Sequence, residues 1–217
     1  MKKTILLILL LSAQILSAQE EEAVLYFKDG TELQGYGMIK SGLLGDKDVI
    51  KFRISSDSEA DIWDSEMVSS IVFVANEYRE EFRYVDISKN VLYPRLLKVF
   101  SEGKVMLYGD IERKSLIDGG INMVIDENAD FKALVSNPKR NKSSMIQNED
   151  MKKVTFYLKR ENEAYPTKFT GTFVSWKNVA KEYFHDCPVI DERIEDKTYK
   201  INNLVEIVDV YNDDCLD

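Results

Sequence analysis

Cys187 and Cys215 have the clearest chemistry in this chain, because they are its only cysteines and both lie near the C-terminus. An even cysteine count in an exported protein favours a disulfide bond. We therefore predict a Cys187–Cys215 disulfide, whose loop closure would stabilise the fold by about 3–4 kcal/mol in the chain-entropy model. A reactive thiol at Cys187 is the competing interpretation.

His185 is the only histidine, so a metal site that needs two or more histidines is excluded. A zinc site made of His185, Cys187 and Cys215 would lack a fourth ligand at a recognisable spacing, and it would compete with the disulfide. A histidine that simply interacts with the dipole of a helix end explains His185 more economically. We predict no cofactor and no metal.

Two acidic runs resemble calcium loops without completing the pattern. In the run that starts at residue 57, Ile62 takes the glycine position and Val68 takes the position of the final glutamate. The run that starts at residue 126 fails at the same two positions. Both runs are more typical of polar turns between strands.

Catalytic residues stay unknown from the sequence. The 38 acidic residues allow a carboxylate pair for glycoside hydrolysis, but composition alone selects no pair. A Ser-His-Asp set is a spatial arrangement and stays open, although no Gly-x-Ser-x-Gly motif occurs. Phosphate-binding and dinucleotide-binding glycine motifs do not occur either.

Tyrosines are common in the strand-rich part of the chain. Tyrosine favours strands, so β-propensity explains most of them. An aromatic ring with a polar edge also suits a platform for a sugar or a peptide. The tyrosines concerned are Tyr26, Tyr36, Tyr78, Tyr84, Tyr93, Tyr108, Tyr157 and Tyr165.

The N-terminal segment has the layout of a secretory signal peptide. Lys2 and Lys3 precede the apolar run 5–11, and small residues at 17–18 offer a cleavage site. The apolar run is too short to span a bilayer, which needs about 20 residues. Cleavage after Ala18, with no cysteine nearby, predicts a soluble periplasmic or secreted protein without a lipid anchor or a transmembrane span.

The charge excludes nucleic acid as a partner, since phosphate binding needs a basic surface. The formal net charge is -9, and it becomes -11 when the two lysines of the signal peptide are removed.

The elements that must position these residues follow a strands-then-helices order, which predicts an α+β fold. Short alternating runs and Gly-containing turns predict a mainly antiparallel β meander or a barrel-like sheet. We expect a signal peptide at 1–18, a β-rich domain at 19–172 with a flexible loop near 136–150, and a helical cap at 173–217. The expected strands lie at 24–27, 33–39, 49–54, 68–75, 81–87, 96–100, 104–108, 121–125 and 154–158.

Apolar residues at helical spacing predict two to three short helices in the C-terminal cap. Pro188 fits the first turn of the middle helix. In an up-down-up arrangement the first and third helices end on the same side, which would bring Cys187 close to Cys215.

Motifs along the mature chain resemble those of small uncharacterised exported proteins of Bacteroidetes that combine a β-rich body with a two-cysteine helical end. These motifs are Lys28-Asp29-Gly30, Lys104–Tyr108, Tyr157–Arg160, Phe184–Pro188 and Val205–Asn212. The resemblance implies an exported protein and carries over no catalytic residue.

We therefore expect an exported, non-enzymatic envelope or extracellular protein that acts as a binding or structural module. Its partner would be a protein, a peptide or a glycan of the cell envelope. The alternative is a small carboxylate-dependent hydrolase with its site in the groove between sheet and helices. That enzyme would need two carboxylates facing each other at about 5–10 Å.

Overall fold

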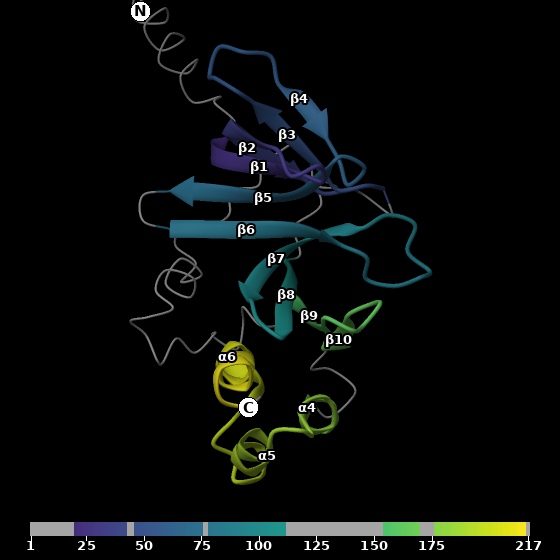
Figure 1. Cartoon of the computed structure of the whole chain (residues 1–217), viewed down its shortest axis with the longest axis vertical. Helices are drawn as coiled ribbons and strands as arrows, with labels where there is room; N and C mark the ends of the chain where they lie inside the picture. The colour runs from purple at the N-terminus through teal and green to yellow at the C-terminus, as the bar shows by residue number, and fades with distance from the viewer. Residues whose placement is uncertain (1–19, 43–45, 76–77, 112–153, 170–175, 216–217) are drawn as a thin grey trace, which may run out of the picture.

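The chain folds into one antiparallel β-sheet followed by helices, which confirms the predicted α+β class (Figure 1). The computed structural model describes residues 20–42, 46–75, 78–111, 154–169 and 176–215. The expected signal peptide, the strand at 121–125 and the loop at 136–150 lie outside these residues. In the part of the chain that is described, no helix has the length and apolar character needed to cross a bilayer.

Within the described residues, ten strands form the sheet. They are β1 (Glu21–Phe27), β2 (Glu32–Lys40), β3 (Val49–Arg53), β4 (Asp61–Trp63), β5 (Val68–Ala75), β6 (Tyr78–Val85), β7 (Arg95–Ser101), β8 (Val105–Ile111), β9 (Val154–Arg160) and β10 (Thr167–Phe169). The predicted β1–β2 hairpin turns at Asp29-Gly30, where Gly30 takes a positive φ of 88° that favours glycine. Sequence reasoning missed the three-residue strands β4 and β10.

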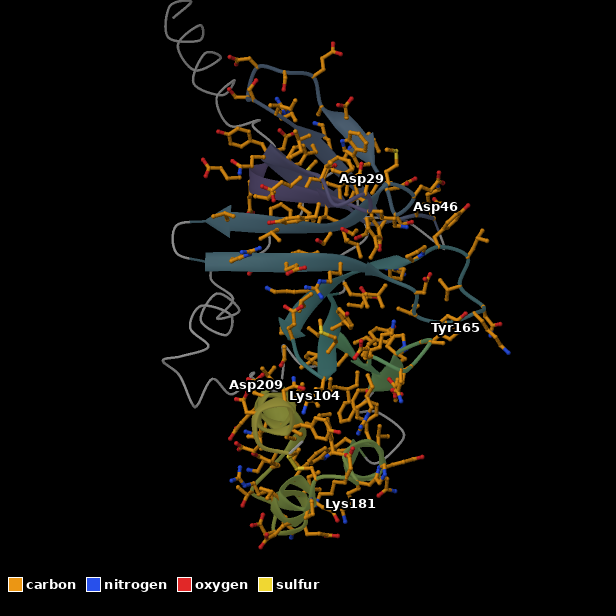
Figure 2. All side chains as sticks on the ribbon, in the orientation of Figure 1. Asp29, Asp46, Lys104, Tyr165, Lys181 and Asp209 are labelled. Atoms are coloured by element: carbon orange, nitrogen blue, oxygen red, sulfur yellow. A yellow bond between two sulfur atoms is a disulfide. The ribbon has the colours of Figure 1, made fainter. Side chains whose placement is uncertain are left out.

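The helices are α4 (Trp176–Tyr183), α5 (Pro188–Glu195) and α6 (Leu204–Asp214), and a short 3₁₀ turn at Ile201–Asn203 precedes α6. Pro188 lies in the first turn of α5, as its fixed φ favours. Lys181 of α4 pairs with Glu195 of α5, and Figure 2 labels Lys181 on this helical end of the molecule.

The strand order β10-β9-β8-β7-β6-β5-β1-β2-β3-β4 is a meander with one exception, because β1 lies between β5 and β2. The sheet stays open, with β10 and β4 at its edges, so the barrel-like alternative is not realised. Five residue steps connect Trp63 to Val68 and span at most about 18 Å. In a flat sheet β4 and β5 would lie about 19 Å apart, so this half of the sheet must curl.

Apolar side chains fill the inside of that curl and form the first core. Leu25, Ile50, Phe52 and Ile71 are almost completely buried there. Phe27 and Trp63 meet edge to face with their ring centroids 5.0 Å apart, which ties β1 to the edge strand β4. The N-terminal strand therefore lies in the middle of a packed unit.

The second core lies between the helices and one face of β8, β9 and β10. Side chains at three- and four-residue spacing on α6, including Leu204, Val208 and Tyr211, pack on Leu107 and Phe156 of the sheet. Asp209 and Asn212 of the same helix reach the β7–β8 hairpin; Figure 2 labels Asp209 there. The helices thus form a cap on one half of the sheet.

Asp48 joins the two halves of the molecule. It precedes β3 in a connection of the curled unit, and its buried carboxylate accepts a hydrogen bond from the backbone N–H of Leu96 at 2.8 Å. Arg95 donates to the same carboxylate at 3.1 Å, while the Tyr84 hydroxyl donates to the Asp48 carbonyl at 2.9 Å. These bonds fix the curled unit to β6 and β7.

Candidate binding groove

Cys187 and Cys215 are joined in a disulfide with their Cα atoms 5.3 Å apart, as the cysteine count predicted. Cys187 lies just before α5 and Cys215 just after α6, so the bond links two ends of the helical cap. With both sulfurs bonded to each other, neither the reactive thiol nor the zinc interpretation holds. His185 is exposed, and its Nδ1 lies 2.9 Å from the Glu182 carbonyl oxygen.

A second link, which we call the Arg160 latch, comprises Arg160, Tyr183, Asp186 and Tyr211. The Arg160 guanidinium donates two hydrogen bonds to Asp186, at 2.8 and 3.1 Å, and lies between the rings of Tyr183 and Tyr211. Hydrogen bonds from Arg160 hold the pKa of Asp186 well below its usual range. Burial, followed by the hydrogen bond to Asp186, raises the pKa of Tyr211 to about 12. The latch holds the cap on β9.

The interface between sheet and helices is where the alternative hydrolase would need its carboxylate pair. In the described residues this interface is packed with apolar side chains, and 16 buried residues form its core. Asp209 lies at its edge and accepts a hydrogen bond from Ser101 at 2.6 Å. Burial of this carboxyl raises the pKa of Asp209, although much of the residue is exposed. The hydrolase hypothesis therefore stays a prediction.

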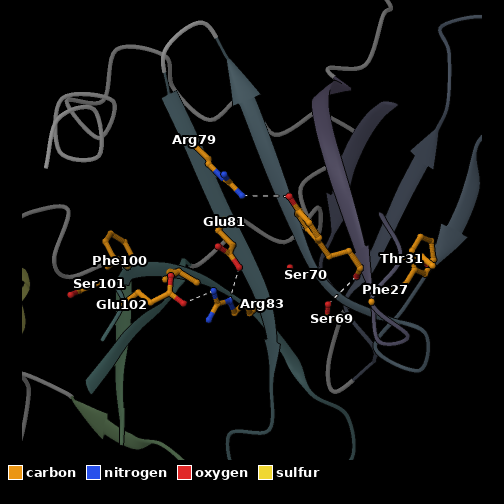
Figure 3. Close-up of a pocket in the computed structure, with 13 residues that line it drawn as sticks. Phe27, Thr31, Ser69, Ser70, Arg79, Glu81, Arg83, Phe100, Ser101 and Glu102 are labelled. Carbon is orange, nitrogen blue, oxygen red and sulfur yellow. Dashed lines mark hydrogen bonds and ion pairs between the residues drawn. The ribbon is translucent and has the colours of Figure 1, made fainter. Parts of the chain in front are cut away.

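A groove of about 750 Å³ lies elsewhere, on the sheet between the curled unit and the capped half. Figure 3 shows β1, β5, β6 and β7 contributing its lining. The β1–β2 turn lines one side and the start of the β7–β8 turn lines the other. This volume falls within the range common for ligand sites, and the groove is open to solvent over much of its length. The lining residues are Tyr26, Phe27, Gly30, Thr31, Ser69, Ser70, Arg79, Glu81, Arg83, Val99, Phe100, Ser101 and Glu102.

Arg83 forms ion pairs with two carboxylates at one end of the groove. It donates to Glu81 on its own strand and to Glu102 at 2.7 Å in the β7–β8 turn. These two carboxylates raise the pKa of Arg83 against the opposing effect of burial. Figure 3 shows the two ion pairs side by side. The arrangement fixes carboxylate oxygens as hydrogen-bond acceptors along the groove.

Arg79 lies at the other end, two residues before Glu81 on the same face of β6. Its guanidinium donates one long hydrogen bond, at 3.5 Å, to the Tyr26 hydroxyl across β5. Among the described carboxylates none forms an ion pair with Arg79, and its side chain is exposed. Most of its five N–H donors therefore face the groove or solvent.

Small hydroxyl side chains of β5 lie at the Arg83 end of the groove. Ser69 donates to the Tyr26 carbonyl at 3.0 Å, and Ser70 lies opposite both Tyr26 and Arg83 in the strand register. Because β1, β5 and β6 are each paired on both sides, their backbone groups are used within the sheet. The groove therefore offers side chains, and not a free strand edge, to a ligand.

Sequence reasoning did not find this groove. The alternation of charged and apolar residues at 81–87 correctly indicated a half-exposed strand, and Tyr26 was weighed as a platform. The missing information was the order of the strands, which brings Tyr26 and Arg79 together across 53 residues of sequence.

Comparisons with protein-family models, with curated proteins and with solved structures find no match to this chain. The geometry of the groove is therefore the basis for assigning a function.

Proposed function

We propose that this chain is an exported, non-enzymatic binding module of the cell envelope or the extracellular space, and that the groove between its two halves is the ligand site. The observation that carries the proposal is the groove itself. It combines a preorganised set of acceptors around Arg83, the available donors of Arg79 and the aromatic ring of Tyr26.

The character of the groove supports binding. Its charged groups are held by partners within the sheet, so a ligand meets them already oriented, and preorganisation lowers the entropic cost of association. Glu81 and Glu102 both accept hydrogen bonds from the Arg83 guanidinium. This arrangement suits carboxylates that act as hydrogen-bond acceptors better than a pair that acts as general acid and general base. Binding a ligand requires no catalytic group beyond these side chains.

The disulfide supports the exported part of the proposal. Disulfides persist in oxidising compartments and are rare in the cytosol of most organisms. Together with the predicted signal peptide, the Cys187–Cys215 bond favours a periplasmic or secreted location. Mass spectrometry of the protein purified from its native host is expected to find Gln19 as the first residue and two oxidised cysteines. An N-terminus at Met1 would contradict export.

The binding role is tested by capture of ligands from an envelope extract on the immobilised mature chain. Replacing Arg79 and Tyr26 together by alanine is expected to abolish capture of whatever the wild type retains. Arg193→Ala is a matched control, because Arg193 on α5 also donates to a tyrosine hydroxyl but lies outside the groove. Equal capture by the wild type and the groove variant would refute the proposal.

A further inference from the structure

We infer that the ligand of the groove is an acidic oligosaccharide, and that Arg79 binds the carboxylate of one of its uronic acid residues. This inference rests on the proposed function and adds the chemical class of the ligand. Three observations carry it: the state of Arg79, the side chains beside it, and the pairing of the strands beneath it.

Arg79 differs from its counterparts in the sheet. Four other described arginines are bound to carboxylates of the protein itself, namely Arg53, Arg83, Arg95 and Arg160. Among the residues that the structure describes, the one side-chain partner of Arg79 is the neutral hydroxyl of Tyr26 at 3.5 Å. A guanidinium presents donors in a planar fork that matches a carboxylate, and such paired bonds are among the strongest polar contacts. Arg79 is therefore placed to take a carboxylate from outside.

The side chains next to Arg79 suit a sugar ring. A sugar has an apolar face, for which an aromatic ring is a platform, and hydroxyls around its edge that both donate and accept. Tyr26 supplies the ring beside Arg79, while Glu81 and Glu102 supply acceptors further along. Ser70 is buried beside Arg83 in the strand register and adds a hydroxyl to the lining. Figure 3 shows Arg79, Glu81 and Arg83 following one another along β6, with Glu102 on one side of Arg83 and Ser70 on the other.

The pairing of the strands argues against an extended peptide as the ligand. Peptides that bind sheets commonly add a strand to a free edge and gain affinity from main-chain hydrogen bonds. The strands under the groove, β1, β5 and β6, have neighbours on both sides. An oligosaccharide needs no main-chain pairing, so side chains alone are sufficient to bind it.

The net charge of the chain opposes an anionic ligand, so the contact at Arg79 must overcome it. With a net charge of -9 the protein repels anions in general, so an anionic ligand must be held by a local contact. Binding through a single exposed ion pair is expected to weaken as salt is added, because screening increases.

The experiment measures binding of the full mature chain, by calorimetry at low salt, to α-1,4-linked trigalacturonic acid and to the neutral galactotriose of the same linkage. The wild type is expected to bind the acidic probe about tenfold more tightly, which corresponds to one charge-assisted contact. Arg79→Gln should remove this preference and leave the affinity for the neutral probe unchanged. Arg193→Gln is the matched control, and circular dichroism confirms folding of each variant.

Each other outcome has a defined meaning. Equal binding of both probes, or an acidic preference that survives Arg79→Gln, would overturn the inference. A Glu-rich peptide that binds more tightly than the trisaccharide, and does so through Arg79, would replace the glycan by a peptide. If neither probe binds while the envelope capture still depends on the groove, the glycan class is wrong and the binding function stands. If that capture also fails, both proposals fall.

Discussion

Asp186 shows how one side chain connects several elements. Asp186 directly precedes Cys187 of the disulfide. Its carboxylate accepts hydrogen bonds from Arg160 of β9 and, at 2.7 Å, from the Tyr211 hydroxyl of α6. Asp186→Asn is expected to lower the free energy of unfolding by about 1–2 kcal/mol at pH 7. The expected loss is this small because a third of the side chain is exposed, where solvent weakens the ion pair. Chemical denaturation of both proteins measures the difference.

The same variant predicts a pH dependence with a definite sign. The folded-state pKa of Asp186 lies below its ordinary value of 3.8, so its contribution is complete above that pH and disappears as the pH falls further. The difference between wild type and Asp186→Asn should therefore be constant from pH 7 to about 5 and shrink below about 4. Asp191→Asn, at an exposed position on α5, serves as the control. A deficit that grows in acid would contradict this role.

Gly35 tests how closely β2 approaches the end of its neighbour β3. A Cβ atom at this position would overlap the carbonyl oxygen of Arg53, which is backbone and cannot move aside cheaply. Gly35→Ala is expected to cost about 2–3 kcal/mol or more through this overlap. A Cβ atom at Gly30 would contact no other atom. Gly30→Ala is therefore expected to lower the free energy of unfolding only through its positive φ, by about 1–2 kcal/mol. Equal denaturation midpoints for the two variants would contradict the close approach of β2 to Arg53 of β3.

At the scale of elements, the disulfide holds the cap and leaves the sheet untouched. Replacing both cysteines by serine is expected to remove about 3–4 kcal/mol, since the bond closes a loop with a sequence separation of 28. Hydrogen exchange should then accelerate in α5 and α6, while β1 and β5 keep their protection. Because Cys187 is 1% exposed, reduction of the wild type should be slow and should reproduce the same pattern. Uniform loss of protection would refute a local role.

The elements differ in how far the sequence predicts them. Strand β5 was predicted at its observed bounds, because Val68–Ala75 is β-branched and apolar enough to be central wherever it pairs. Strands β4 and β10 were missed, because three residues such as Asp61–Trp63 have no period of their own and become a strand only through a partner. The helices followed from their apolar spacing and from Pro188.

The groove was beyond prediction for a related reason. Its residues come from four strands, and its character depends on Tyr26 and Arg79 meeting across β5. Local pattern indicated which face of each strand is polar, but it carried no information on which polar faces adjoin. The insertion of β1 between β2 and β5 decides that, and it is a long-range pairing.

At the scale of the whole molecule, Asp48 is expected to make the two halves unfold together. Asp48→Ala would leave the buried N–H of Leu96 without its acceptor and remove the partner of Arg95, at a cost of about 3 kcal/mol. Calorimetry should then resolve two transitions in place of one, with the curled unit unfolding first. Asp57→Ala, on an exposed turn, is the control and should leave a single transition. One unchanged transition in Asp48→Ala would show that the sheet alone provides the coupling.

The central place of β1 also affects the order in which the chain can fold. Ala23 pairs with Phe73 and Leu25 with Ile71, contacts that close loops of about 50 residues, while the β5–β6 and β7–β8 hairpins close within a few residues. We therefore expect the hairpins, β1–β2 among them, to form early and the pairing of β1 with β5 to form late. Until β5 has emerged, β1 can pair only with β2, at the edge of a four-stranded meander of β1 to β4. The curled unit therefore lacks one neighbour of β1 until Val68–Ala75 has been synthesised.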